Sequence, residues 1–394
     1  MRGFWDCYGR NGVVMQNGLE IKVVKKIEDL PQGDWEKVFP AALENYNFFK
    51  TLDQSSFEQF SFFYLLAYEN NHPVAATSCF LFNFPLDVAV NGKIKFLFSA
   101  IKKILPNIFS PRVLICGLPM GAGRIGITRD ADRVILALDD CLEKIAGEHK
   151  AAMVIFKDFT AGYDQMLKPL LSRGFSKIES FPSTEMEINF KSFDEYLKTL
   201  SRVSRDGLKR NFKKVDGKLK IEMEVTNVLN DATAEAAHQL YRQTMNRQEM
   251  GLENLPLDFF KNASRNMPNE VKFFLWRSEG KLIAFAFCLV RGDYFIDYYL
   301  GFDYALAHQY HLYFVRFRDL LNWCIEHGVK RYEMGVTAYE PKRRLGFKFI
   351  RFYFYMKHRN RLLNRFVGLV SHFMKPANFD PVFKQMEAND AAAD

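Results

Sequence analysis

The hydrophobic positions of the chain form two hairpin-like patterns that lie far apart in the sequence. Residues 61–82, SFFYLLAYENNHPVAATSCFLF, read as two apolar strands joined by a Glu-Asn-Asn-His turn. Residues 271–290, VKFFLWRSEGKLIAFAFCLV, have the same form, with a Glu-Gly-Lys turn between the strands. Amphipathic sequence with helical spacing precedes each hairpin. The chain is therefore predicted to form the same local fold twice.

The parallel continues downstream of both hairpins. Residues 138–163 and 317–339 each read as a helix, a His-containing stop and a strand that leaves into a segment with Thr and Tyr. Basic residues, a Gly-Phe pair and a final strand follow each time, with the Gly-Phe pairs at 174–175 and 346–347. One unit repeated twice explains this order economically. We predict an α/β fold of two tandem mixed sheets flanked by helices, the second copy having a basic loop where the first has a helix.

The expected organisation has five parts. These are a disordered lead at 1–18, in which Met15 is an alternative start, a first α/β domain at 19–192, a basic bridging helix at 193–218, a second α/β domain at 219–375, and a disordered tail at 376–394. At 394 residues, two domains match the usual domain size.

Composition favours a cytoplasmic protein. The six cysteines show no C-x-x-C spacing and lie mostly in apolar runs, as expected of reduced core thiols rather than metal ligands or disulfides. No signal-peptide pattern opens the chain, and no apolar run reaches the length of about 18–20 residues that a membrane span needs. These features argue against a secreted or membrane-spanning protein.

The net charge of +8 points to anionic partners. Within 193–218 a basic stripe at helical spacing either binds an anion or forms a solvated face; it comprises Lys198, Arg202, Arg205, Lys209 and Lys213. Residues 93–109 and 358–375 read as basic amphipathic helices, which either pack on the core or lie on an anionic membrane surface. Peripheral contact with the inner membrane face is therefore one expectation.

The order of elements, the Gly-Phe pairs and the duplication resemble the GNAT acyltransferase superfamily in its tandem form. The resemblance covers about residues 40–370 and is greatest to Fem-type aminoacyl-tRNA-dependent peptidoglycan transferases and acetyltransferase-like proteins. It implies transfer of an acyl or aminoacyl group from an anionic carrier (acyl-CoA, acyl carrier protein or aminoacyl-tRNA) to an amine of a cell-envelope or lipid precursor. The carrier would be a co-substrate, with no tightly bound cofactor.

Two other classes of function are alternatives. A non-catalytic binding or regulatory protein with the same fold is one alternative. Nucleic-acid binding through the basic stripe is the other, but no recognisable RNA-binding motif is present and DNA is not expected as a partner.

The segment GLPMGAGRIG, residues 117–126, lies where the resemblance implies a loop that holds the pyrophosphate of coenzyme A. Gly121, Gly123 and Arg124 are the candidate contacts, and a tight structural turn is the alternative. The matching segment of the second unit, residues 299–314, has one glycine and no phosphate-loop pattern, which puts ordinary acetyl-CoA use in doubt. His308 and His311 stand there at a predicted helix start.

Proton transfer in such a reaction needs few groups, and the second unit offers them. Asp297 and Glu333 lie on strands amid aromatics and are candidate bases, or else form ion pairs with Arg331, Arg351 or Lys330. Tyr339, just past a strand end, is a candidate acid or a packing residue. Lys342 and Arg343 in the following loop are candidate anion contacts or a solvated turn.

Overall fold

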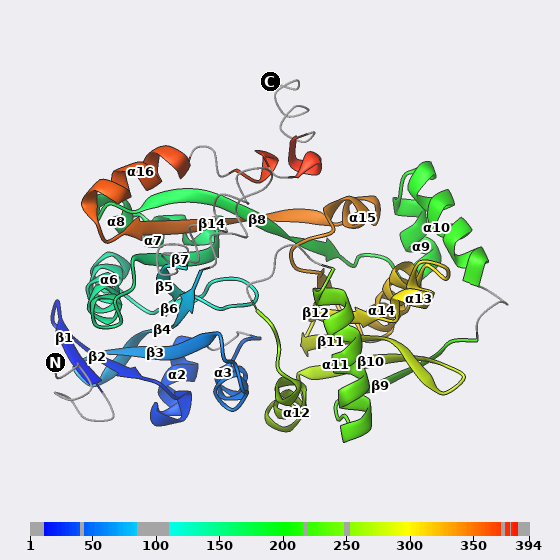
Figure 1. Cartoon of the computed structure of the whole chain (residues 1–394), viewed down its shortest axis with the longest axis horizontal. Helices are drawn as coiled ribbons and strands as arrows, with labels where there is room; N and C mark the ends of the chain where they lie inside the picture. The colour runs from blue at the N-terminus through cyan, green and yellow to red at the C-terminus, as the bar shows by residue number, and fades with distance from the viewer. Residues whose placement is uncertain are drawn as a thin grey trace. The chain divides into compact units, whose positions relative to one another are not determined.

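The chain forms two compact α/β units, seen in a computed structural model that describes residues 12–39, 43–84, 110–215, 220–247, 253–371, 375–378 and 380–384 (Figure 1). Unit 1 comprises Met1–Asp53, Phe57–Phe181 and Arg351–Asp394, and unit 2 comprises Gln54–Ser56 and Pro182–Ile350. Each unit has its own hydrophobic core.

Unit 1 is built on a mixed sheet with the order β1-β2-β3-β4-β5-β7-β14, and β6 pairs with β4. Only the pair β5 and β7 is parallel among these neighbours. The strands are β1 (Gly12–Gln16), β2 (Leu19–Val24), β3 (Phe60–Glu69), β4 (His72–Asn83), β5 (Arg112–Cys116), β6 (Ile125–Ile127), β7 (Met153–Thr160) and β14 (Lys348–His358).

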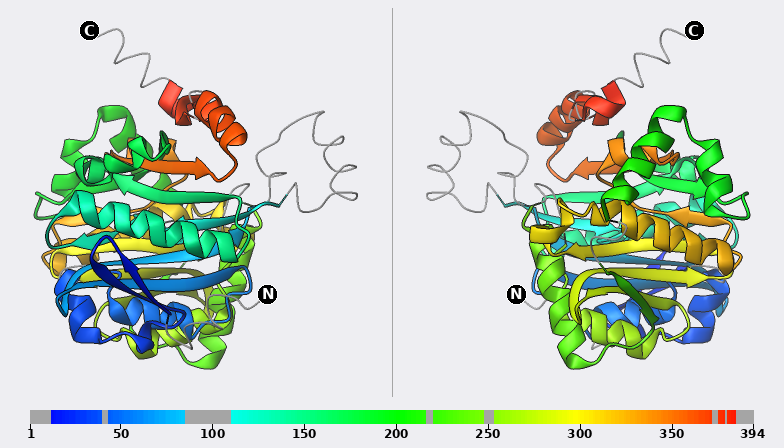
Figure 2. Two further views of the ribbon diagram at one scale, coloured as in Figure 1. Left: turned by 90° about the vertical axis from the view of Figure 1, so that its left-hand side faces the viewer. Right: turned by 90° about the vertical axis from the view of Figure 1, so that its right-hand side faces the viewer.

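Helices cover both faces of this sheet, so its strands are continuously apolar. Phe63 and Leu65 of β3 point into the core that α6 closes, and the left view of Figure 2 shows α6 lying across the sheet. The intervening Tyr64 packs edge-on against Trp35 and Phe49 on the other face. The helices of unit 1 are α2 (Gln32–Val38), α3 (Tyr46–Asp53), α6 (Ala131–Glu148), α7 (Asp164–Leu167), α8 (Pro169–Ser172) and α16 (Arg361–Ser371), with 3-10 turns η1 (Ile27–Asp29), η3 (Ala161–Tyr163) and η4 (Pro376–Asn378).

Unit 2 has the strand order β8-β13-β12-β11-β10-β9. Its strands are β8 (Ser176–Glu187, in unit 2 from Pro182), β9 (Glu222–Thr226), β10 (Val271–Ser278), β11 (Lys281–Arg291), β12 (Tyr294–Phe302) and β13 (Arg331–Glu333). Its helices are α9 (Phe193–Thr199), α10 (Arg202–Val215), α11 (Asp231–Met245), α12 (Leu257–Asn266), α13 (Tyr304–Ala307), α14 (Leu312–Glu326) and α15 (Tyr339–Arg344). The right view of Figure 2 shows α14 lying across this sheet.

The two predicted hairpins occupy corresponding positions in the two sheets. The hairpin β3-β4 is followed by antiparallel β5 and then parallel β7, and the hairpin β10-β11 is followed by antiparallel β12 and then parallel β13. Helices precede each hairpin, and one long helix, α6 or α14, connects the parallel strands. Both units therefore have the order of elements along the chain that the repeated sequence pattern predicted.

The last strand of each unit comes from the other half of the sequence. Within the part of β8 that belongs to unit 2, residues 185–187 pair with β13, with Glu185 opposite Glu333. Residues 352–358 of β14 pair with β7 of unit 1. The units therefore differ from the expected divisions at 192 and 219. A strand's local pattern specifies which side chains face the core but not which strand lies beside it.

Several local expectations also differ from the structure. Residues 12–16 of the expected disordered lead form β1, because Asn17 and Gly18, at φ 49° and 75°, make a tight hairpin turn into β2. In the tail that was expected to be disordered, at 376–394, Phe383 packs against Phe181, with 6.5 Å between the ring centroids. Residues 1–11, 85–109 and 385–394 lie outside the described part of the chain. The amphipathic helix expected at 93–109 therefore lies entirely outside it.

The expected bridging helix is two helices, α9 and α10, that belong to unit 2. Leu208, Phe212 and Val215 of α10 are buried, so this segment is part of the unit rather than a linker. The segment expected to be a basic loop around Lys342 and Arg343 is the short helix α15. In the described residues, the five cysteines are buried and free, and no helix has the length and apolar character to cross a membrane.

The exchange of last strands predicts where a mutation near the C-terminus acts. Tyr355→Ala, in the core of unit 1, should destabilise unit 1 by about 3–5 kcal/mol, as expected for truncation of a buried aromatic ring. Phe347→Ala, only eight positions earlier, should instead loosen unit 2, whose core contains Phe347. Hydrogen exchange of the full chain measures both. Faster exchange in β10–β12 rather than in β5 and β7 of the Tyr355 variant would contradict the assignment.

Candidate functional site

The parallel strands β12 and β13 of unit 2 separate soon after they begin. Their pairing covers Tyr294 with Arg331, Phe295 with Tyr332 and Ile296 with Glu333. β13 then ends, while β12 continues to Phe302. The chain turns into α15 through residues 335, 337 and 338, which all have positive φ, at 60°, 72° and 50°. Asp297 and Glu333 thus lie at the point of separation, as two of the predicted catalytic residues.

Asp297 belongs to a buried ion pair. Its carboxylate contacts the guanidinium of Arg316 on α14, and both side chains are 1% exposed. The Tyr332 hydroxyl donates a second hydrogen bond to Asp297 at 3.2 Å. Burial raises the pKa of Asp297, although Arg316 and Lys342 act in the opposite direction. The structure thus favours the ion-pair interpretation, with a partner that differs from the three basic residues considered from the sequence.

The partner of Asp297 retains unused hydrogen-bonding capacity. Among the described residues, Nε and Nη1 of Arg316 and the hydroxyl of Tyr313 are buried without a hydrogen-bond partner. Both residues lie in the first turns of α14. The sequence carried a signal for Arg316, because it stands on the apolar stripe of Leu312, Leu320 and Cys324 at spacings of four. A charge on such a stripe indicates a buried partner.

Glu333 faces the other side of the sheet from Tyr332, because consecutive strand residues alternate. Its carboxylate accepts a hydrogen bond from Ser183 Oγ at 2.5 Å and another from the Tyr294 hydroxyl. The Glu333 side chain is half-buried, whereas Ser183 is buried. Ser183 comes from β8, the strand supplied by the first half of the sequence, so sequence analysis had no basis for placing it here. A half-buried carboxylate held by two hydroxyl groups is suited to accepting a proton.

Lys342 does not stand at a surface rim as expected. It is 4% exposed, and its ammonium donates to the carbonyl oxygens of Met334, Gly335 and Val336 at 2.8, 3.0 and 3.1 Å. Burial lowers the pKa of Lys342 to about 7. Lys342 therefore holds the chain in place where it leaves β13.

The neighbours of Lys342 on α15 also differ from the expected anion-binding loop. Arg343 and Arg344 both pair with Glu340, at 2.9 and 2.8 Å, on the exposed side of the helix. Tyr339 is buried, donates its hydroxyl to the carbonyl oxygen of Pro182 at 2.9 Å and packs against Phe349. The structure thus favours a packing role for Tyr339 over a role as catalytic acid.

The glycine-rich segment of unit 1 is a closed structural turn. The Gly123 amide donates to the carbonyl oxygen of Asp158 at 2.9 Å, and an added Cβ would lie 2.2 Å from the carbonyl oxygen of Lys157. Arg124 pairs with the buried Glu44 at 2.8 Å. Gly121 adopts φ 76°, which a turn requires. These contacts favour the structural-turn interpretation for Gly121, Gly123 and Arg124.

The first turns of α6 and α14, which occupy the same position in the two units, differ in charge. α6 begins with Asp130 as N-cap and Asp132 in its first turn. α14 has no acidic residue there, and its N-cap is His311, whose pKa is lowered by burial and by the nearby Lys214 and His308. Because a helix N-terminus favours anions, α14 is the better suited of the two to an anionic group.

The basic face of α10 lies in the same unit as α14. Arg202 is 87% exposed and contacts Asp206 at 3.7 Å, Arg205 is half-buried, and Lys209 is exposed. Arg318 of α14 stacks over Phe212 of α10 at 5.1 Å, which joins the two helices. The basic stripe is interrupted between Lys198, on α9, and the remaining residues on α10.

Comparisons with known proteins agree with this architecture. The FemAB-like family, described as peptidoglycan biosynthesis/recognition, matches residues 119–387. The crystal structure of FemX covers 86% of this chain and 98% of its own, with a TM-score of 0.53 and 11% identity. A tandem GNAT protein from the clavulanic acid biosynthesis pathway covers 87% of this chain and 99% of its own, with a TM-score of 0.51 and 10% identity. These structures share the fold.

A curated relative from Mycobacterium tuberculosis, named "Putative 8-amino-7-oxononanoate synthase 2", is 24% identical over 326 residues. The match spans 79% of this chain and only 42% of that protein. The chain thus corresponds to less than half the length of the curated relative it matches.

The α/β class, the GNAT-type fold and the relationship to Fem-type proteins, all predicted from the sequence, are confirmed by these comparisons. The predicted transferase activity, with its donor and acceptor, stays a prediction at this point, because solved structures at 10–11% identity show the fold alone. Since the family match spans more than half of the 394 residues, the chain belongs to the FemAB-like family.

Proposed function

We propose that the chain is an acyl- or aminoacyltransferase that acts on a cell-envelope precursor, with unit 2 as the reactive unit. The acyl group would leave an anionic carrier, namely aminoacyl-tRNA, acyl-CoA or acyl carrier protein, and form an amide with an amine of the precursor. A cytoplasmic site of action, with contact at the inner membrane face, is part of the proposal.

The observation that carries this proposal is the arrangement around the separated ends of β12 and β13. Glu333 stands there as a half-buried carboxylate, with hydroxyl groups of Ser183 and Tyr294 as its hydrogen-bond donors. An amine must lose a proton when it attacks an ester or thioester carbonyl, and a carboxylate so placed can accept it. The two hydroxyl groups orient the carboxylate and offer a path for the proton.

The charge distribution of unit 2 suits an anionic donor. The N-terminus of α14 lacks acidic residues, and Lys214 lies near its N-cap His311. Arg202, Arg205 and Lys209 extend positive charge along α10. Unit 1 has the opposite character at its matching helix, since Asp130 and Asp132 occupy the N-terminus of α6. The contrast supports assigning the donor to unit 2.

A non-catalytic binding function is the second candidate, and a specific observation favours it. Tyr339 and the Gly121–Gly123 turn, two features expected to serve transfer, are engaged in packing and main-chain contacts. If unit 2 only recognises a precursor, the Glu333 cluster would bind the precursor's amine as an ammonium without accepting its proton.

The first test replaces the proposed base. Glu333→Gln keeps the size and most hydrogen-bonding capacity of the side chain but cannot accept a proton, so transfer should slow by about 10²–10⁴-fold. The assay uses tRNA charged with radiolabelled amino acids, or radiolabelled acetyl-CoA in a separate arm, with UDP-N-acetylmuramoyl pentapeptide as acceptor. Glu185→Gln is the matched control, because Glu185 lies opposite Glu333 in the sheet but pairs with the exposed Arg331.

Transfer by the Glu333 variant at the rate of the parent chain would remove Glu333 as the base. If the parent chain transfers no label with either donor but binds the pentapeptide, the binding function takes precedence.

The second test concerns the protonation of the buried Lys342 and its effect on stability. Its pKa of about 7 in the folded chain is below the ordinary value of 10.5, so between these values the unfolded chain binds more protons. The free energy of unfolding should therefore rise with pH over this window, by about 1.4 kcal/mol per pH unit, relative to Lys342→Met. Urea unfolding followed by tryptophan fluorescence measures the difference, with exposed Lys348→Met as the control. If the free energy of unfolding changes with pH in the same way for the parent and for Lys342→Met, Lys342 remains charged throughout this window.

A further inference from the structure

We propose that α16 is a docking surface for an anionic lipid bilayer. This inference rests on the proposed function and extends it, because it names the surface through which unit 1 would meet the membrane. Lipid binding itself is tested separately from transfer.

The helix α16 exposes its apolar side. Leu362, Phe366 and Leu369 are 74%, 62% and 69% exposed, and Leu363 is 50% exposed. At 100° per residue these four side chains share one face of the helix. Together they account for four of the large exposed apolar side chains found among the described residues, concentrated on one helix of 11 residues. A contiguous exposed apolar face of this kind indicates an interaction site.

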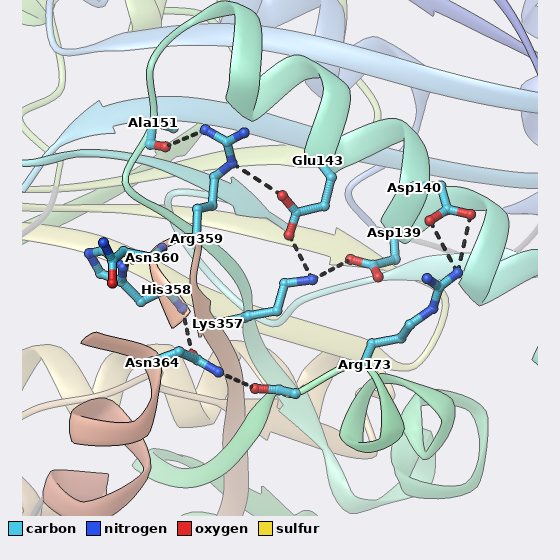
Figure 3. A network of polar contacts seen from close by, with 11 residues as sticks. Asp139, Asp140, Glu143, Ala151, Arg173, Lys357, His358, Arg359, Asn360 and Asn364 are labelled. Carbon is cyan, nitrogen blue, oxygen red and sulfur yellow. Dashed lines mark hydrogen bonds and ion pairs between the residues drawn. The ribbon is translucent and has the colours of Figure 1, made fainter. Parts of the chain in front are cut away.

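The polar side of α16 faces the protein. Asn364 donates to the carbonyl oxygen of Gly174 at 2.8 Å and accepts from the amide of His358 at 2.8 Å (Figure 3). The Asn360 side chain caps the helix by accepting from the amides of Leu362 and Leu363 at 3.0 and 3.2 Å. The helix is therefore held in place by polar contacts, and its apolar side is left outward.

The segment leading into α16 is anchored by charge. Lys357 lies 2.6 Å from Glu143 on α6, and Arg359 donates to Glu143 at 3.2 Å and to the carbonyl oxygen of Ala151 at 3.3 Å (Figure 3). Lys357 also lies 3.6 Å from Asp139. These contacts tie the end of β14 to α6, so the orientation of α16 is set by unit 1 rather than by its own apolar face.

The charge of the residues around α16 indicates which partner binds its apolar face. Residues 351–379, the part of unit 1 that contains α16, include six Lys or Arg and no Asp or Glu. On the helix itself, Arg361 and Arg365 are exposed and lie beside the apolar face. Apolar side chains flanked by arginine, without acidic residues, match the interface of a bilayer that contains anionic lipids. A second copy would bring the same arginines together and repel itself.

Vesicle binding by the full chain tests the proposal. The parent chain should co-sediment with vesicles of phosphatidylcholine and phosphatidylglycerol at 7:3, and much less with phosphatidylcholine alone. Leu362→Ser/Phe366→Ser should reduce the partition coefficient by about tenfold or more, because two large apolar groups no longer enter the interface. Arg361→Gln/Arg365→Gln should reduce it by about thirtyfold at low salt, and little at high salt.

Matched controls distinguish binding through α16 from nonspecific hydrophobic or electrostatic binding. Met15→Ser removes a side chain that is 66% exposed on β1 of the same unit, and Lys37→Gln/Arg129→Gln removes two exposed positive charges elsewhere in unit 1. Neither variant should change the partition coefficient. Circular dichroism checks that each variant is folded.

Three outcomes would overturn the proposal. The parent chain could fail to bind anionic vesicles at low salt, or the Leu362/Phe366 variant could bind them as well as the parent. Alternatively, light scattering could show that the parent is a dimer and the Leu362/Phe366 variant a monomer, which would make a second copy the occupant. Transfer to the water-soluble pentapeptide is measured in parallel. If vesicle binding fails but transfer is intact, the proposed function still holds. If transfer fails but vesicle binding is intact, the lipid-binding surface still holds.

Discussion

The pairing of residues 185–187 of β8 with β13 is the constraint on which the candidate site depends. This pairing places Ser183 against Glu333, and it brings the carbonyl oxygen of Pro182 to the hydroxyl of Tyr339. β13 itself is only three residues long, so its position relies on its neighbours on both sides. A strand from the first half of the sequence thus completes the unit that carries the predicted catalytic residues.

Buried ionisable side chains position the site from the face of the sheet opposite Glu333. Asp297 and Arg316 are both withdrawn from water, a costly arrangement that their mutual attraction and the Tyr332 hydroxyl offset in part. Lys342 adds a third buried ionisable group, whose hydrogen bonds go to the main chain after β13. Replacing such groups with apolar residues is often neutral or stabilising in proteins, so their presence here is better explained by positioning than by stability.

The two units share one architecture but differ in the side chains that it carries. In unit 1 the glycine-rich turn is packed against β7, and acidic residues stand at the start of α6. In unit 2 the matching region has neither feature, and a basic helix packs beside α14. Unit 1 instead carries α16, with its polar side anchored and its apolar side exposed. Fold alone does not distinguish the two units, since these differences lie in individual side chains.

Much of the fold was determined by the sequence itself. The apolar hairpins, the long amphipathic helices and the repeated order of elements follow from local periodicity, because burial of one face requires a fixed spacing of apolar residues. The placement of Asp297 and Glu333 on strands followed from the same patterns. The amphipathic character of residues 358–375 was also visible, since it needs only the helical repeat.

Only the tertiary structure decided which strands lie side by side and which side chains meet. The exchange of the last strands, the contact of Ser183 with Glu333 and the pairing of Asp297 with Arg316 join residues that are far apart in the sequence or on separate elements. The outward orientation of the apolar side of α16 was decided in the same way, by the hydrogen bonds of Asn364. Periodicity specifies that a face is apolar, whereas what that face meets depends on long-range packing that no local pattern encodes.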